Sequence, residues 1–191
     1  MEKIIAVLDA CVLYPAPVRD FLLNLAARKL FDPKWSEQIH SEWIRNLISK
    51  RPDLISHQLE RTKRLMDEAF PEANVVDFDL PDRKVSLPDP NDHHVLDVAI
   101  KSHARYIVTF NLKDFPASQL KLCSIAAKSP DEFIKSLIEL NSREVIKAFQ
   151  TQVTNLKNPP MEQEEVLKTL EKNGLRTTVL ELRKHLKLER S

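Results

Sequence analysis

A short apolar run near the N-terminus, from Ile4 to Leu8, ends abruptly on the carboxylate of Asp9. A continuous, largely β-branched run of this length is typical of a strand that is buried on both faces. Such strands occur in parallel sheets covered by helices, where ligands bind beyond the carboxyl ends of the strands. Asp9 stands at such an end. It either caps the following turn or holds a ligand, and the run alone leaves both roles open.

Strand patterns and helix patterns alternate along the first two thirds of the chain. We predict three further strands, at residues 74–78, 106–110 and 122–126. Apolar residues at helical spacing predict helices over residues 21–30 and 36–50, a third helix that Asp53 caps and that reaches Phe70, and a fourth that begins at Asp92. This alternation predicts an α/β fold with helices on both faces of a central parallel sheet, which gives three layers, α/β/α.

The pattern changes after Lys128, where helix signals follow one another without strands. Ser129 and Glu132 form a capping box with proline between them, and Asn141 begins another helix signal. Two more helices follow and are separated near Gly174. We therefore expect two domains: an α/β domain over residues 1–127 and an all-helical C-terminal extension over residues 128–191.

The composition excludes several classes of protein. Gly174 is the single glycine of the chain, so glycine-rich phosphate-binding loops of the Walker and Rossmann types are excluded. No apolar run reaches the length of a membrane span, and the N-terminus does not resemble a signal peptide, so we expect a cytoplasmic protein that does not enter a membrane. Cys11 and Cys123 lack metal-ligand spacing and are expected to be buried thiols rather than a disulfide.

Acidic residues recur where the predicted elements begin and end. Asp92 falls on the apolar stripe of its helix, where an ionised group is costly without a cation or hydrogen-bond donors. Asp97 lies on the opposite face of the same helix and is expected to be solvated. Glu42 lies at the edge of the stripe that contains Trp43, with Asn46 one turn further on. Capping or solvation explains each of these acids singly, so the alternative roles stay open.

A third group of polar residues follows the predicted strand at 106–110. Asn111 and Asp114 come after its carboxyl end, where Thr109 adds a hydroxyl group. Carboxylates and an amide at one sheet edge suit a hard divalent cation, which prefers oxygen ligands. Two such cations would activate a water and stabilise the leaving oxygen in phosphodiester cleavage.

Together these segments resemble the PIN-domain nucleases, and in particular the VapC-type toxins of toxin–antitoxin pairs. The resemblance spans residues 4–127 and rests on the stretches LDACVLYP, WSEQIHSEWIRNL, DPNDHHVLDVAI and YIVTFNLKDF. The helical tail resembles the C-terminal extension of one branch of these proteins. The resemblance implies a PIN-like sheet with strand order 3-2-1-4-5 and an endoribonuclease that depends on Mg²⁺ or Mn²⁺.

Residue roles follow from the same resemblance. The expected catalytic acids are Asp9, Glu42, Asp92 and Asp114, of which Asp9, Asp92 and Asp114 would bind metal. Many relatives have aspartate where this chain has Asn111, so we assign the fourth charge to Asp114. Asn111, Thr109 and Asn46 are expected to support the site. Asp20 and Asp89 are secondary candidates that are more typical of structural roles.

The expected substrate is structured RNA, with tRNA as one candidate, cleaved by a metal-activated water. The expected protein partner is a cognate antitoxin, and homodimer formation is left open. The alternative function is a catalytically weakened PIN-like protein that binds RNA or protein as a regulator, and Asn111 is its best support. An aspartyl nucleophile at Asp9 is disfavoured, because the second aspartate of such sites is here Cys11. His93 and His94 are expected at the surface or in caps, and Trp35 and Trp43 in the core.

Overall fold

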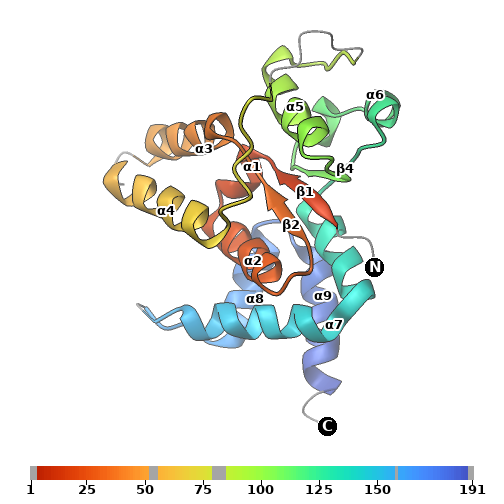
Figure 1. The fold of residues 1–191 in the computed structure, drawn as a ribbon. Coiled ribbons are helices and arrows are strands. Elements are labelled where there is room, and N and C mark those ends of the chain that lie inside the picture. The colour runs from red at the N-terminus through yellow and green to blue at the C-terminus, as the bar shows by residue number, and fades with distance from the viewer. Residues whose placement is uncertain (1–3, 52–55, 79–84, 158, 189–191) are drawn as a thin grey trace. The chain divides into compact units, whose positions relative to one another are not determined.

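The computed structural model describes residues 4–51, 56–78, 85–157 and 159–188. The chain forms two compact units, and each has buried apolar residues of its own. Figure 1 draws the helices and strands of both. The first contains Met1–Tyr14 and Asp32–Lys128, and the second contains Pro15–Phe31 and Ser129–Ser191. The second unit thus takes residues 15–31 in addition to the C-terminal helices. The predicted division at residues 127 and 128 into two domains stays a prediction.

A parallel sheet forms the centre of the first unit. Its strands have the order β2-β1-β3-β4, and their bounds are Ile5–Leu8 for β1, Asp32–Lys34 for β2, Tyr106–Val108 for β3 and Ala126–Lys128 for β4. Trp35, directly after β2, forms a parallel bridge with Asn74 on the side away from β1. The four strands agree with the 2-1-4-5 part of the order 3-2-1-4-5 that the resemblance implies, and the implied third strand is present only as this bridge. The predicted α/β fold with a central parallel sheet is confirmed.

Two strand predictions need correction, and one strand was not predicted. The strand expected at 74–78 is reduced to the single bridge at Asn74. β2 was not predicted, because the sequence Asp-Pro-Lys has no apolar pattern and becomes extended by pairing with β1. The strand expected at 122–126 begins only at Ala126, because Lys121–Cys123 form a 3-10 turn and Ser124 after it adopts a left-handed conformation with φ of 59°.

Helices flank this sheet and position the polar residues at its edge. Their bounds are Ala10–Leu13 for α1, Glu37–Lys50 for α3, Ser56–Ala69 for α4, His93–Lys101 for α5 and Ala117–Leu120 for α6, with 3-10 turns η1 at Pro90–Asp92, η2 at Leu112–Asp114 and η3 at Lys121–Cys123. The side chain of Ser36 caps α3 by accepting from the backbone N–H of Ile39 at 3.3 Å. Trp35 and Trp43 are fully buried, as predicted. Asp53, the predicted cap of α4, lies outside the described residues.

The second unit is helical, with α2 at Ala16–Ala27, α7 at Pro130–Asn155, α8 at Gln163–Lys172 and α9 at Arg176–Leu188. The predicted capping box of Ser129 and Glu132 is present at the start of α7. At Asn141 the backbone leaves helical geometry, and the Asn141 side chain accepts from the N–H of Glu144 at 3.2 Å, so this residue starts a new helical segment as predicted. Phe21 and Phe149 pack edge to face with ring centres 6.2 Å apart.

No described helix is both long and apolar enough to cross a membrane.

Candidate functional site

Asp9 is fixed at the carboxyl end of β1 in the middle of the sheet. Its backbone N–H donates to the carbonyl of Val108 at 3.1 Å, and its side chain is only 5% exposed. The carboxylate makes no capping bond to α1. Instead its Oδ2 atom accepts from Thr109 Oγ1 at 2.7 Å and from Cys11 Sγ at 3.1 Å. The Asp9 side chain therefore does not cap α1, which was one of the two roles that the sequence left open.

The surroundings of Asp9 form a small network. Burial raises the pKa of Asp9, the hydrogen bonds from Thr109 and Cys11 oppose this, and the charge of Glu42 adds to the increase. Thr109 is fully buried and accepts from the backbone N–H of Asn111 at 2.9 Å, so it orients Asp9 and the following turn together. Cys11 is a free thiol whose pKa is raised mainly by burial, so it stays protonated at neutral pH.

One face of α3 lines a hollow of about 520 Å³. Four side chains on this face contribute to it, at a spacing that places them on one side of the helix: Gln38, Ser41, Glu42 and Arg45. The carboxylate of Glu42 lies 3.4 Å from Nε2 of His94 in α5. His94 is 8% exposed, and its Nδ1 atom has no hydrogen-bond partner among the described residues. The contact fixes Glu42 from a second element.

The opposite side of this hollow comes from two other segments. Asp89, Asn91 and Asp92 lie in and before η1, while Asn111 and Asp114 follow β3. Burial and the charges of Asp9, Asp89, Asp114 and Glu42 raise the pKa of Asp92 to about 6. Carboxylates from four distant parts of the sequence therefore act on one another here. We call this hollow the acidic hollow. Its lining residues are Gln38, Ser41, Glu42, Arg45, Asp89, Asn91, Asp92, Asn111 and Asp114.

Several sequence expectations have a different outcome. Asp97 was expected to be solvated and is fully buried, because α5 is covered on all sides from His94 to Ala99. Asn46 is exposed and does not line the acidic hollow. Asp20 belongs to the helical unit, where it lies 3.5 Å from Arg19. His94, expected in a cap or at the surface, is buried against Glu42.

One residue of the acidic hollow was named only as a secondary candidate and another was not named. Asp89, the secondary candidate, belongs to the lining, and its side chain also accepts from the backbone N–H of Asn91 at 2.9 Å. Arg45 lies three residues after Glu42 on the same helix. The helical spacing of Gln38, Ser41 and Arg45 from Glu42 would have indicated a shared face. The identity of the partner segments could not be read from spacing.

The donor set of the acidic hollow fits a hard divalent cation, because it consists of carboxylate and amide oxygens with an excess of negative charge. Within the described residues, no three side chains of His, Cys, Asp or Glu gather closely enough to enclose a metal ion by themselves. Mg²⁺ is usually held by one or two carboxylates and keeps several waters. The arrangement therefore fits a partly hydrated ion, and the choice of ligands stays a prediction.

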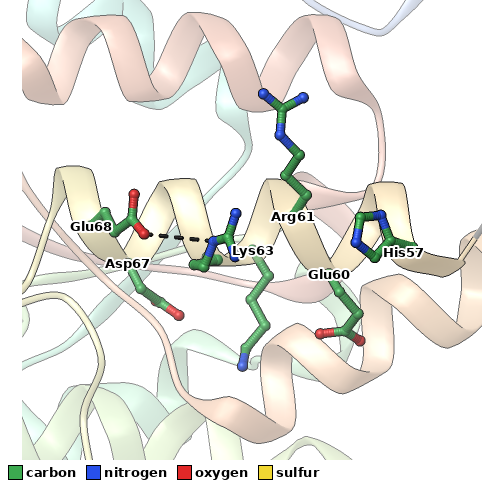
Figure 2. A pocket seen from close by; sticks show the side chains of 7 residues that line it. His57, Glu60, Arg61, Lys63, Asp67 and Glu68 are labelled. Atoms are coloured by element: carbon green, nitrogen blue, oxygen red, sulfur yellow. Dashed lines mark ion pairs between the residues drawn. The ribbon is translucent and has the colours of Figure 1, made fainter.

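A second hollow, of about 600 Å³, lies along α4 and has another character. All of its lining residues come from this helix and carry both signs of charge (Figure 2). Arg64 pairs with Glu68 at 3.6 Å, and Lys63 pairs with Glu37 of α3 at 2.8 Å. In the view of Figure 2, Arg61 and Glu60 extend to different sides of the helix. This α4 hollow is a surface of exposed, mostly balanced charges and not a convergent site.

Comparison with known proteins identifies related sequences for both parts of the chain. The family model of the PIN domain matches residues 6–113, and the model of the VapC50 C-terminal domain matches residues 130–184. A protein of Mycobacterium tuberculosis named "Putative ribonuclease VapC50" is 45% identical over 49 residues. These are 26% of this chain and 29% of that protein, so the matched stretch spans less than a third of the relative's length. No solved structure was found to match.

The PIN domain match includes more than half of the chain and contains Asp9, Glu42 and Asp92, together with the turn at Asn111. It agrees with the parallel sheet order and with the acidic hollow at the carboxyl edge of that sheet. The helical C-terminal region has a family match of its own, which agrees with the resemblance seen in the sequence. The chain belongs to the PIN domain family.

Proposed function

We propose that this protein is an endoribonuclease that depends on Mg²⁺ or Mn²⁺ and acts as the toxin of a toxin–antitoxin pair. The observation that carries the proposal is the gathering of Glu42, Asp89, Asp92 and Asp114 around one hollow. Burial, followed by the charges of neighbouring carboxylates that include Asp9, raises the pKa of Asp92 to about 6, which agrees with this gathering. Structural carboxylates are usually paired with cations or hydrogen-bond donors, whereas a cluster of like charges is costly until a cation neutralises it. The PIN domain match and the name of the mycobacterial relative support the same reaction class.

The residues that would hold the cation are Asp9, Asp92 and Asp114. A bound divalent ion would supply charge neutralisation at the phosphate and a more acidic water. Asp9 is well prepared for this role, because Thr109 and Cys11 hold its Oδ2 atom in one orientation. Asn111 would contribute an amide oxygen or a hydrogen bond from the rim of the acidic hollow.

Glu42 would act on the attacking water. His94 holds its carboxylate at 3.4 Å, and its position in the acidic hollow leaves it accessible to a water molecule. In the proposed reaction the water oxygen bonds to the phosphorus of an RNA phosphodiester while Glu42 accepts the water proton. The bond from phosphorus to the leaving oxygen then breaks, and that oxygen takes up a proton. The products are two shorter RNA strands.

Structured RNA, with tRNA as one candidate, is the proposed substrate, and the proposed setting is the cytoplasm. A cognate antitoxin is the proposed protein partner, in agreement with the family match of the C-terminal region. These parts of the proposal rest on the family and not on the geometry of the acidic hollow.

The substitution Asp9→Asn tests the reaction. Asparagine keeps the size of the side chain and an oxygen that can accept from Thr109, but it removes the charge that would bind the cation. We expect RNA cleavage in Mg²⁺ or Mn²⁺ to fall about 100-fold or more, with an unchanged circular dichroism spectrum. Glu60→Gln, which removes an exposed acid of α4, is the matched control and should cleave as fast as the parent. Equal cleavage by Asp9→Asn and the parent would contradict the assignment.

A second candidate function is a PIN-like regulator that binds RNA or protein without cutting it. Two observations favour it: Asn111 carries no charge, and no three metal-binding side chains gather among the described residues. This alternative requires that the parent protein cleaves no RNA with either metal and does not arrest growth when it is expressed. Cleavage that disappears on chelation of the metal would exclude it.

A further inference from the structure

We propose that Arg45 binds a backbone phosphate of the RNA strand that enters the acidic hollow. The inference rests on the proposed function and adds to it a residue that would recognise the substrate. It starts from the charge of the hollow, whose lining carries four carboxylates, from Glu42, Asp89, Asp92 and Asp114. Such a surface repels the phosphates of RNA. A substrate phosphate therefore needs a cationic side chain in addition to the metal ion.

Arg45 is the cationic side chain in this lining. It lies seven residues after Gln38 and three after Glu42, so it shares the helix face that borders the hollow. It is exposed and forms no ion pair within 4 Å with any described residue, although Glu42 is its neighbour at a spacing where helix pairs form. An arginine that lines a carboxylate-rich hollow without pairing to it keeps its hydrogen-bond donors available for an anion.

The chemistry of the guanidinium group suits a phosphodiester. It is planar and charged at every pH of interest, and it can donate two parallel hydrogen bonds to two phosphate oxygens. Ser41, one turn before Arg45 on the same face, offers a hydroxyl group to the same strand. A phosphate at Arg45 would place the neighbouring linkage over the carboxylates at the other side of the hollow. The RNA strand would thus contact the positive charge of Arg45, and the metal ion would bind the carboxylates of the same hollow.

The direct test is RNA binding without chemistry. The probe is a fluorescent single-stranded uridine dodecamer, and its anisotropy is measured in EDTA at several salt concentrations. We expect Arg45→Ala to weaken binding about 10-fold and to lower the slope of log K against log salt by about 0.7, the value for one phosphate contact on a single strand. Arg45→Lys should restore the slope but only part of the affinity, because lysine cannot donate in the same fork.

The matched control is Arg61→Ala, which removes the same charge from the α4 hollow of the same unit. It should leave the slope and the affinity near those of the parent. Mn²⁺ binding, followed by calorimetry, gives a readout that a folding defect would not reproduce. Loss of a positive charge beside the carboxylates should make Mn²⁺ bind more tightly to Arg45→Ala, while RNA binds more weakly.

These measurements separate the two proposals. If the parent does not cleave RNA, the proposed function is wrong. The slope of log K against log salt for RNA binding would still test the role of Arg45. Equal RNA affinity and equal slopes for Arg45→Ala and the parent would overturn the inference, even if the parent is an active nuclease. That result would also be expected if Arg45 instead met a carboxylate of a protein partner. Equal losses in Arg45→Ala and Arg61→Ala would overturn it too, because they would indicate a general effect of net charge.

Discussion

The two hollows of the sheet-containing unit differ in how their charges arise. The α4 hollow is the larger, at about 600 Å³ against about 520 Å³, but its residues come from one helix and its charges form local pairs such as Arg64 with Glu68. The acidic hollow is lined by three separate segments, and burial together with the charges of nearby carboxylates raises the pKa of Asp92. Convergence of like charge from distant segments, and not the volume of a hollow, therefore identifies the candidate site.

Two glutamates of α3 provide the most direct test of whether the two hollows differ in their importance for RNA cleavage. Glu42 lies in the acidic hollow, whereas Glu37 pairs with Lys63 beside the α4 hollow. We expect Glu42→Gln to lower the rate of RNA cleavage by about 100-fold, because the amide cannot accept the proton of the attacking water. Glu37→Gln should change this rate by less than twofold. Single-turnover cleavage assays in Mg²⁺ measure both rates, and equal rates for the two variants would remove the distinction between the hollows.

A second prediction concerns the cost of the clustered charge. The pKa of Asp92 is about 6 in the folded chain against an ordinary value of 3.8, so the folded state disfavours the ionised form. The destabilisation appears as the pH rises from about 3.8 and is complete above pH 6. Without metal at pH 8, Asp92→Asn should therefore raise the melting temperature by about 2 °C or more, and by less at pH 5. Solvent screening of this partly exposed group limits the gain.

Calorimetry of Asp92→Asn and the parent at both pH values, in EDTA and in Mg²⁺, provides the measurement. Added Mg²⁺ should stabilise the parent more than the variant, because a ligand that binds only the folded state raises its stability. A lower melting temperature for the variant at pH 8 in EDTA would show that Asp92 is a structural carboxylate satisfied by hydrogen-bond donors.

The smallest effect is expected at the α4 hollow. Lys63→Ala removes the ion pair with Glu37 at 2.8 Å, in which Glu37 is largely exposed. Exposed pairs contribute little, so we expect the free energy of unfolding to fall by about 0.5 kcal/mol and the rate of cleavage to stay constant. Urea unfolding combined with the cleavage assay tests this. A large loss of cleavage would indicate that the α4 hollow takes part in RNA binding.

Local patterns predicted most of the elements for identifiable reasons. The capping box at Ser129, the helix restart at Asn141 and the break at Gly174 are present because each depends on bonds between residues a few positions apart. β2 escaped prediction because its three residues become extended only through pairing with β1. Asp97 was misjudged because a helical wheel gives the direction of a side chain but not what covers it.

The sequence by itself determined the helices and the buried runs that deliver Asp9 and Thr109 to the edge of the sheet, because apolar periodicity and capping act over short distances. It also supplied every acid of the candidate site, although Asp89 was only a secondary candidate. Only the tertiary structure decided that Thr109 and Cys11 hold Asp9, that His94 contacts Glu42, and that Arg45 borders the same hollow. These relations join residues up to 100 positions apart, and such distances are closed by packing and not by local preference.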